Sequence, residues 1–280
     1  MKRITILLLV FFSSQLARAQ AGYLDETFGK YGFVFAETSG FSEYALSVAV
    51  MPDGKIFQCS SATNENGSYG RLILRRYNPN GSIDSSFADN GAYISNDITS
   101  FVSAKIFPYS DGRTLVVGQI ASGYISNGKI QYSPFILRLL SNGNVDTSFG
   151  KNGVISEYHH GVSEEYCSAR IENDGIIVII GARGDTGKML PVVTKLNSNG
   201  EKLSSFGDEG TVSVYSSTEP IFIADADINS SGDCVFAGSY GPEGFKNTII
   251  IRSNIHGELV PSFGNNGVVR VANFDTDEEV

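Results

Sequence analysis

Side chains that could do acid–base or metal chemistry are few in this sequence, and they gather in one stretch. The residues EYHHG place His159 and His160 side by side, close to three glutamates: Glu157, Glu164 and Glu165. Imidazole and carboxylate groups bind zinc when they converge on one point. Adjacent residues of a strand point to opposite faces of a sheet, so an extended stretch would separate the two histidines. We expect a solvated loop here and no metal site.

Other catalytic motifs find little support. The sequence has no Gly-x-Ser-x-Gly elbow, no zincin helix motif and no cysteine paired with a credible histidine. The triplet Arg183-Gly184-Asp185 falls in a segment that we expect to form a hairpin loop, where chance occurrence is favoured over integrin-type adhesion. The Gly-Lys pair that follows lacks the spacing of a phosphate-binding P-loop. We assign no catalytic residue, no cofactor-binding residue and no cofactor.

Glycoside hydrolysis stays open, because it needs only two well-placed carboxylates and the chain has 30 acidic residues. Two longer loops, residues 62–71 and 120–133, also carry side chains that could stack on or hydrogen-bond to a sugar: Tyr69, Tyr124, Tyr132, Asn64, Asn66 and Asn127. The same residue types suit loops that face solvent. We favour this second interpretation.

Three cysteines are too few for a disulfide framework or a zinc site. Cys59 and Cys234 lie at nearly matching places in apolar runs, which is typical of small core residues. One disulfide between two of the three cysteines is an open alternative, and it would leave Cys167 or another thiol free.

Composition and charge narrow the class of protein. The 280 residues are 41% hydrophobic, so the chain can bury a core, and 31 glycines with 8 prolines indicate many tight turns. The net charge of −9 argues against binding of nucleic acid, which needs clustered lysine and arginine. It argues equally against electrostatic docking on an anionic membrane.

The first nineteen residues resemble a cleavable signal peptide. Lys2 and Arg3 precede an apolar run from Ile4 to Phe12, and Ala17-Arg18-Ala19 has the small-x-small pattern of a cleavage site. The apolar run is shorter than the roughly twenty residues that span a bilayer. We therefore expect export to the periplasm or outer surface of the cell envelope, or secretion, without membrane insertion.

One eleven-residue motif occurs five times and sets the domain organisation. The copies are GYLDETFGKYG, GSIDSSFADNG, GNVDTSFGKNG, GEKLSSFGDEG and GELVPSFGNNG, beginning at Gly22, Gly81, Gly143, Gly200 and Gly257. The spacing of 57 to 62 residues is too long for a solenoid repeat and suits a four-stranded propeller blade with generous loops.

Each period reads as four short strands. A turn with Gly, mostly Asp-Gly, separates two apolar runs, as in MPDGKIF and ENDGIIV, and this is a hairpin signal because glycine supplies positive φ. A third run, such as RLILRRY, leads through a polar turn into the motif. The residues after the motif, including FVFAE at 33–37, alternate like a fourth, half-buried strand. His256 occupies the turn position that holds asparagine in three other repeats, so we interpret it as a turn residue.

The motif itself predicts a hinge with a hydrophobic plug. Phenylalanine is the one large apolar residue of an otherwise small and polar connection in each copy: Phe28, Phe87, Phe149, Phe206 and Phe263. We expect its ring to fill the seam between successive blades, while the glycines let the backbone bend around it. Asp25, Asp84 and Asp146 are expected to form local side-chain-to-backbone hydrogen bonds.

The pattern G-x-[LIV]-D-x-[ST]-F-G-x-x-G resembles the delta-60 repeat family, and the resemblance covers the chain from Gly22 to about Val271. It implies a bacterial, secreted or surface-located β-propeller and no particular activity. Ala88 departs from the pattern after the phenylalanine, and Leu203 and Val260 replace the aspartate in copies four and five. These replacements speak against a catalytic or calcium site shared by the aspartates.

The sequence thus predicts an all-β fold over residues 20–280, after a signal peptide over residues 1–19. This fold is a β-propeller of four to five four-stranded blades, either complete or incomplete. We interpret it as a non-enzymatic binding or scaffold module that meets a protein or glycan ligand at one mouth of the propeller. The alternative is a carbohydrate-active enzyme with carboxylates in the central funnel. Two acids from different blades beside one pocket would favour the enzyme. A third interpretation is a truncated array without function.

Overall fold

The computed structural model of the chain describes residues 23–38, 40–64, 70–124, 130–185, 188–242 and 246–271, and these contain strands and turns but no helix. None of its described segments could therefore span a membrane as a helix. The strands are β1 (Phe41–Val50), β2 (Ile56–Asn64), β3 (Arg71–Tyr77), β4 (Ala92–Thr99), β5 (Phe101–Pro108), β6 (Thr114–Tyr124), β7 (Ile130–Leu139), β8 (Val154–Ser156), β9 (Ser163–Ile171), β10 (Ile177–Asp185), β11 (Lys188–Leu196), β12 (Thr211–Ser213), β13 (Ile221–Ile228), β14 (Asp233–Tyr240), β15 (Asn247–Asn254) and β16 (Val268–Val271).

The strands form four successive antiparallel meanders, which we name units 1 to 4: β1–β4, β5–β8, β9–β12 and β13–β16. A single parallel strand pair, Met189 with Phe222, links units 3 and 4 into one eight-stranded sheet. The all-β prediction and the prediction of four strands in a period are therefore confirmed.

The hairpin between the first two strands of a unit depends on local turn chemistry. In unit 1 the amide of Met51 donates to the carbonyl of Lys55 at 2.8 Å, and the carboxylate of Asp53 accepts from the amide of Lys55 at 3.1 Å. Gly54 has φ of 81°, a conformation that favours glycine. The turn therefore follows directly from the sequence around residue 54.

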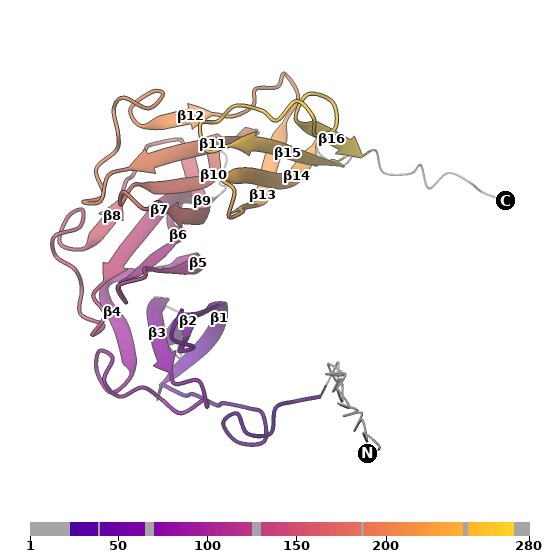
Figure 1. Ribbon diagram of the computed structural model, residues 1–280. Coiled ribbons are helices and arrows are strands. Elements are labelled where there is room, and N and C mark those ends of the chain that lie inside the picture. Colours follow the sequence, from indigo (N-terminus) through magenta and orange to yellow (C-terminus); the bar gives the residue numbers. More distant parts are fainter. Residues whose placement is uncertain are drawn as a thin grey trace, which may run out of the picture.

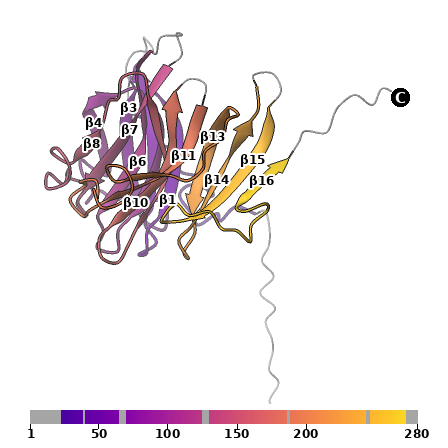
Figure 2. The ribbon, with the colours of Figure 1, turned by 90° about the horizontal axis from the view of Figure 1, so that it is seen from above.

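The units stack face to face (Figures 1 and 2). They bury three hydrophobic clusters between them. Phe57 and Cys59 of unit 1 pack with Phe135 and Leu137 of unit 2 in the first cluster. The second and third clusters lie between units 2 and 3 and between units 3 and 4. The middle strands are apolar on both faces because each inner sheet is covered on both sides. The buried run from Ile177 to Ile180 is an example.

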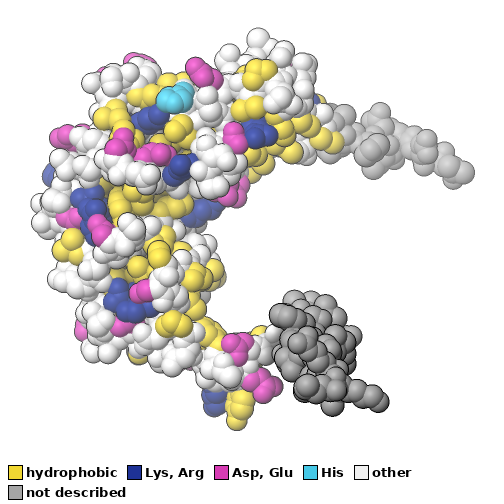
Figure 3. All heavy atoms as spheres, viewed as in Figure 1, with side chains coloured by type: hydrophobic (Ala, Val, Ile, Leu, Met, Phe, Trp, Pro, Cys, Tyr) yellow, Lys and Arg dark blue, Asp and Glu magenta, His cyan; other side chains and the backbone are white. Residues whose placement is uncertain are grey.

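The four units follow an open arc, with unit 1 and unit 4 at its two ends (Figure 1). The space-filling view shows the same opening when side chains are included (Figure 3). One face of unit 1 is consequently not covered by another unit, and the site described below lies on that face.

One predicted strand is wrong. Residues 33–37 were expected to pair like the other segments that follow the motif, but Phe33 makes only an isolated bridge with Lys30, and residues 34–38 have no strand pairing. The third strand that would precede this copy of the motif does not lie within the described residues. Within the described residues this segment therefore has no neighbouring strand to pair with, although its own sequence is suitable.

All three cysteines are free, so the alternative of a disulfide is wrong. Cys59 and Cys234 are fully buried, which confirms their interpretation as core residues. Burial raises the pKa of the Cys59 thiol to about 12. This thiol is therefore a packing group without nucleophilic character at neutral pH. The predicted signal peptide, residues 1–19, lies outside the described residues.

Candidate functional site

The repeated phenylalanine lies in the seam between successive units. Phe87 and Phe149 are fully buried and belong to the clusters between units 1 and 2 and between units 2 and 3. Each ring lies against a guanidinium of its own unit, 4.6 Å from Arg76 and 4.4 Å from Arg138. Cation–π contacts of this kind are favourable when they are shielded from water. The predicted role of the phenylalanine as a plug is confirmed for these two copies.

A buried ion pair holds each of these guanidinium groups in place. Nε of Arg76 donates to Asp84 at 2.7 Å, and Nε of Arg138 donates to Asp146 at 2.8 Å. The guanidinium of Arg138 also donates to the main-chain carbonyl of Ser198 in the next unit at 2.5 Å. The motif therefore combines an ion pair and a cation–π contact within one unit with a hydrogen bond to the main chain of the next unit.

A main-chain hydrogen bond repeats at three junctions. The amide after the phenylalanine donates to an asparagine carbonyl of the following turn at 2.7–2.8 Å: Gly29 to Asn80, Ala88 to Asn142 and Gly150 to Asn199. Ala88 makes this bond with φ of 46°, close to the 53° of Gly150. The alanine therefore keeps the geometry of the motif.

Copies four and five lack the aspartate, and their cations use other partners. The Lys195 ammonium lies 4.5 Å from the centre of the Phe206 ring, and Arg252 pairs with Asp233 at 2.8 Å. The side chain of Arg252 is 36% exposed, whereas that of Arg138 is 3% exposed. Arg252 thus pairs with a different carboxylate, while Lys195 keeps the contact with the phenylalanine of its own copy.

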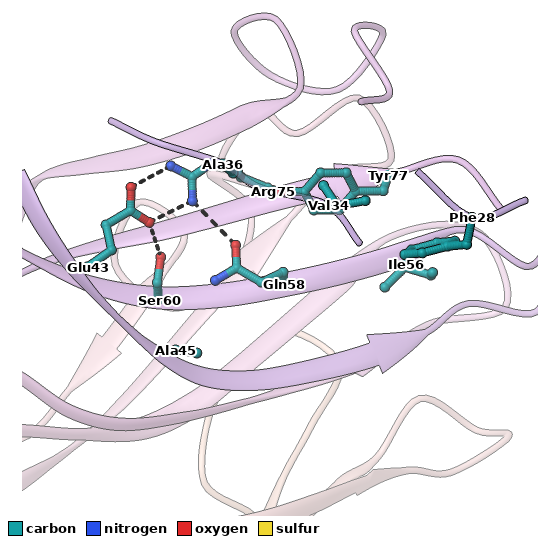
Figure 4. Close-up of a pocket in the computed structure, with 10 residues that line it drawn as sticks. All are labelled: Phe28, Val34, Ala36, Glu43, Ala45, Ile56, Gln58, Ser60, Arg75 and Tyr77. Carbon is teal, nitrogen blue, oxygen red and sulfur yellow. Dashed lines mark hydrogen bonds and ion pairs between the residues drawn. The ribbon is translucent and has the colours of Figure 1, made fainter. Parts of the chain in front are cut away.

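A pocket of about 380 Å³ lies between unit 1 and the unpaired segment 33–37. Its polar half is formed by Glu43, Gln58, Ser60 and Arg75 (Figure 4). The Arg75 guanidinium donates to both carboxylate oxygens of Glu43, at 2.7 and 2.6 Å, and the Ser60 hydroxyl donates to the same carboxylate at 2.8 Å. These polar groups mainly satisfy one another.

The apolar half of the pocket lies at the other end and contains Phe28, Val34, Ile56 and Tyr77 (Figure 4). Phe28 and Val34 come from the first motif copy and the segment after it, while Ile56 and Tyr77 come from β2 and β3. An apolar side chain entering the pocket would contact these four residues. The pocket thus has a neutralised polar end and an apolar end.

The charge state of Glu43 limits what the pocket can do chemically. Burial alone would raise the pKa of this carboxyl, but hydrogen bonds from Arg75, Thr38 and Ser60 outweigh burial and lower the pKa to about 2. A general acid works best when its pKa lies near the working pH. Glu43 therefore orients Arg75 and is poorly suited to transfer protons at neutral pH.

We expect Glu43→Gln to destabilise the protein at neutral pH and to matter less in acid. The folded pKa of about 2 lies below the ordinary value of 4.5, so the stabilisation from Glu43 is complete above about pH 4.5 and is lost as the pH falls towards 2. Urea midpoints of wild type and variant, measured by circular dichroism across this range, should converge at the acid end. A constant gap at all pH values would contradict the assignment.

The face of unit 1 that holds the pocket is more polar than the corresponding faces of the other units. Gln58 and Arg75 occupy positions that hold buried, mostly apolar residues elsewhere: Val116, Ile179 and Phe236 for Gln58, and Leu137, Thr194 and Ile251 for Arg75. The other faces contact a preceding unit, and this one does not. Its composition is that of a face that meets water or a reversible partner.

The histidine stretch forms a loop between β8 and β9, as predicted, but one of its side chains does meet two glutamates. His159 lies 3.4 Å from Glu157 and 3.8 Å from Glu164, and Lys202 also binds Glu157 at 2.7 Å. Over the described ranges, no group of three histidine, cysteine or acidic side chains is arranged to hold a metal ion. The sequence did not predict this convergence, because Glu164 comes from the following strand.

Two predicted loops are wrong for the residues that the structure describes. Arg183, Gly184 and Asp185 lie in β10, paired with β9 and β11, because the hairpin is shorter than the sequence indicated. Tyr132 lies half-buried in β7, since the hairpin strands extend further than expected. Among the other proposed sugar contacts, Tyr69, Asn66 and Asn127 lie outside the described residues, as do the side chains of Asn64 and Tyr124.

Comparisons with known proteins place the repeats among β-propellers and leave the activity open. Residues 52–87 and 110–149 match the model of a domain of unknown function, DUF5122 β-propeller. No curated protein matches the chain.

Three solved structures are distantly similar. A mannose phosphorylase from Leishmania mexicana, MPT-4, is 11% identical, with 78% of this chain and 69% of that chain covered and a TM-score of 0.40. A hypothetical protein from Leishmania major is 10% identical, with 84% and 69% covered and a TM-score of 0.40. Drosophila Plexin A in complex with Semaphorin 1b is 12% identical, with 82% and 66% covered and a TM-score of 0.26. Scores this low carry no inference about activity.

The repeated motif, the four-stranded meanders and the matching family model agree with one another. The chain contains a β-propeller domain, and two of its segments, residues 52–87 and 110–149, are similar to the repeats that the DUF5122 model describes.

Proposed function

We propose that this protein is a non-enzymatic binding or scaffold module of the bacterial cell envelope or of the secreted fraction. It is a propeller of four to five blades, exported by the signal peptide at residues 1–19, and it meets a protein or glycan ligand. The observation that carries the proposal is the pocket on the uncovered face of unit 1. At its polar end Arg75 and Glu43 pair with each other, so the apolar end is the part of the pocket that can contact a ligand.

The position of this pocket changes where we look for the ligand. Hairpin loops at one mouth of the propeller were the predicted contact surface, and the tips of the loops between the second and third strands of each unit lie outside the described residues. The pocket instead uses strand residues of unit 1 and the segment before it. Rigid strands position side chains more accurately than loops do.

Four pockets lined by described residues lack the pair of carboxylates from different repeats that a carbohydrate-active enzyme would need. Hydrolysis needs two carboxylates that face one substrate. Three further pockets are lined by acids of only one repeat each: Asp89 in the first, Glu172 and Asp174 in the second, and Glu37 in the third. In the pocket of unit 1, the carboxylate of Glu43 is occupied by Arg75.

A screen of purified residues 20–280 against a glycan array and a peptide library, with the mass in solution recorded, tests the proposal. We expect saturable binding of one ligand class and no turnover. Ala45→Trp should fill the pocket and weaken binding by about tenfold or more. Val235→Trp, at an exposed strand position of unit 4, is the control and should leave the affinity unchanged.

Release of a shortened glycan or another product from the bound ligand would contradict a non-enzymatic role. Equal affinity of wild type and Ala45→Trp would show that the ligand binds elsewhere on the molecule. In that case the pocket would no longer support the proposal.

A further inference from the structure

The first copy of the motif has the local shape of the later copies. Oδ1 of Asp25 accepts from the amide and the hydroxyl of Thr27, at 3.0 and 2.5 Å. Oδ1 of Asp84 accepts from Ser86 in the same way, at 3.2 and 2.6 Å. The loop is therefore already folded around the carboxylate in both copies.

The two copies differ at the other carboxylate oxygen. Oδ2 of Asp84 accepts from Arg76 and Oδ2 of Asp146 accepts from Arg138, both in buried pairs. In the part of the chain that the structure describes, no cation pairs with Asp25, which is exposed. The carboxylate of Asp25 thus presents an oxygen where the later copies bind a guanidinium.

The ring of the first copy lacks the same partner. Phe87 and Phe149 are fully buried under Arg76 and Arg138. Phe28 is only partly buried, and over the described ranges no cation stacks on it. Asp25 and Phe28 together form half of a site that is complete in copies two and three.

The segment after the motif lacks a strand partner at the same place. In each unit, the first residue after the last motif glycine pairs with the residue just before the cation: Ala92 with Arg75, Val154 with Leu137, Thr211 with Thr194 and Val268 with Ile251. Phe33 occupies this position in the first copy and has no such pairing. Phe33 and Phe35 are 48% and 82% exposed. Such an apolar edge is a template for an added strand.

Space for a strand exists beside this edge. Val34 and Ala36 line the pocket of unit 1 together with Ile56 and Tyr77. An added strand would pair with residues 33–37 and place alternate side chains in the apolar half of the pocket, because side chains of a strand alternate between its faces. The free edge, the pocket and the half-site at Asp25 therefore form one continuous surface.

The first copy has no cation at the matching position of the sequence. Arg76 and Arg138 each precede their aspartate by eight residues, and the residue eight before Asp25 is Ala17. Residues 272–280 contain no lysine or arginine. The polar composition of the face, with Gln58 and Arg75 in place of apolar residues, suits a partner that binds reversibly.

We propose that Asp25, Phe28 and the edge of residues 33–37 bind an extended strand of another protein, and that an arginine of this strand inserts between Asp25 and Phe28. The inference rests on the proposed binding function, for which it names the partner as an arginine-bearing β-strand. The arginine takes the place that Arg76 and Arg138 take in the later copies. The carboxylate, the ring face and the edge of the backbone then recognise one ligand together.

The test uses a labelled peptide with the sequence of the third strand of unit 1, GRLILRRYNPNG, and residues 20–280 of the protein. Fluorescence anisotropy should show saturable one-to-one binding. Replacement of the third arginine of the peptide, which corresponds to Arg76, by glutamine should weaken binding by about tenfold or more, as loss of a charge-assisted hydrogen bond does. Asp25→Asn in the protein should have a similar effect, and the two changes together should cost little more than either alone.

Two further variants sharpen the assignment. Phe28→Ala should weaken binding by about threefold to tenfold through the lost ring contact. Asp208→Asn removes the same charge from an exposed position of copy four and should leave the affinity within about twofold. Hydrogen exchange of the amides at residues 33–37 should slow on binding, because pairing protects them.

The proposal fails if the folded protein does not bind the peptide. It fails equally if both peptides bind with the same affinity, because the groove would then accept any apolar strand. Sedimentation as a dimer that Asp25→Asn dissociates would identify the occupant as a second copy and would also overturn it. Binding of a glycan without binding of the peptide would leave the proposed function standing and end this inference alone.

Discussion

Phe149→Ala should lower the free energy of unfolding by about 3–5 kcal/mol, which is the usual cost of removing a fully buried aromatic side chain. The ring fills the seam between units 2 and 3, together with Leu115, Ile136 and Ile177. Its loss leaves a cavity there and removes the aromatic face beneath Arg138. The change in urea midpoint, followed by circular dichroism because the chain lacks tryptophan, measures the effect.

Phe28→Ala is the matched control within the same motif. Phe28 is only partly buried and lies at the uncovered end of the array, so its removal should cost less than about 1.5 kcal/mol. Similar losses for both variants would contradict the view that the phenylalanine acts as a plug between units. Repeat arrays can unfold in steps, so the shape of the transition should be compared as well as its midpoint.

Asp146→Ala should cost about 3–5 kcal/mol, because it leaves the guanidinium of Arg138 buried without its counter-charge. Burial would raise the pKa of Asp146, but hydrogen bonds from Ser148 and the charge of Arg138 outweigh burial and lower it. The contribution of this carboxylate is therefore present above the ordinary carboxyl pKa and is lost as the pH falls below it. Urea midpoints at neutral pH and in acid should show a gap that narrows in acid.

An exposed pair gives the control. Lys105 and Asp225 lie 2.7 Å apart, but their side chains are 43% and 67% exposed, so Asp225→Ala should change stability by less than about 1 kcal/mol. The double variant Arg138→Met with Asp146→Leu should recover much of the loss of Asp146→Ala, because no charge then stays buried. A small effect of Asp146→Ala would show that Arg138 finds another partner, as Arg252 does with Asp233.

The hairpin turn and the eleven-residue motif of each repeat could be predicted from sequence, because the glycines that identify them act on the local backbone. A turn such as that at Gly54 needs only a residue that accepts positive φ between two apolar runs. The alternation and the length of the runs then predict strands, and the spacing of the motif predicts one four-stranded unit per period. The burial of Cys59 and Cys234 follows from their places in these runs.

Contacts between units could not be predicted in this way. The guanidinium of Arg138 donates a hydrogen bond to the carbonyl of Ser198, 60 residues further on. The local sequence around neither residue indicates this contact. His159 meets Glu164 because the loop before β9 folds back onto that strand. Residues 33–37 read like every other fourth strand, yet they are unpaired, since pairing depends on a neighbour and not on the segment itself.

By itself, the sequence determined the all-β class, the repeat and the four strands of each unit, because turn chemistry and side-chain alternation act over a few residues. Only the tertiary structure decided which faces are covered. It buried the ion pairs of the second and third copies and left the first copy with an open carboxylate, an open ring and an open edge. The physical reason is that the burial and the strand pairing of a residue depend on which other segment packs beside it, and not only on the residue itself.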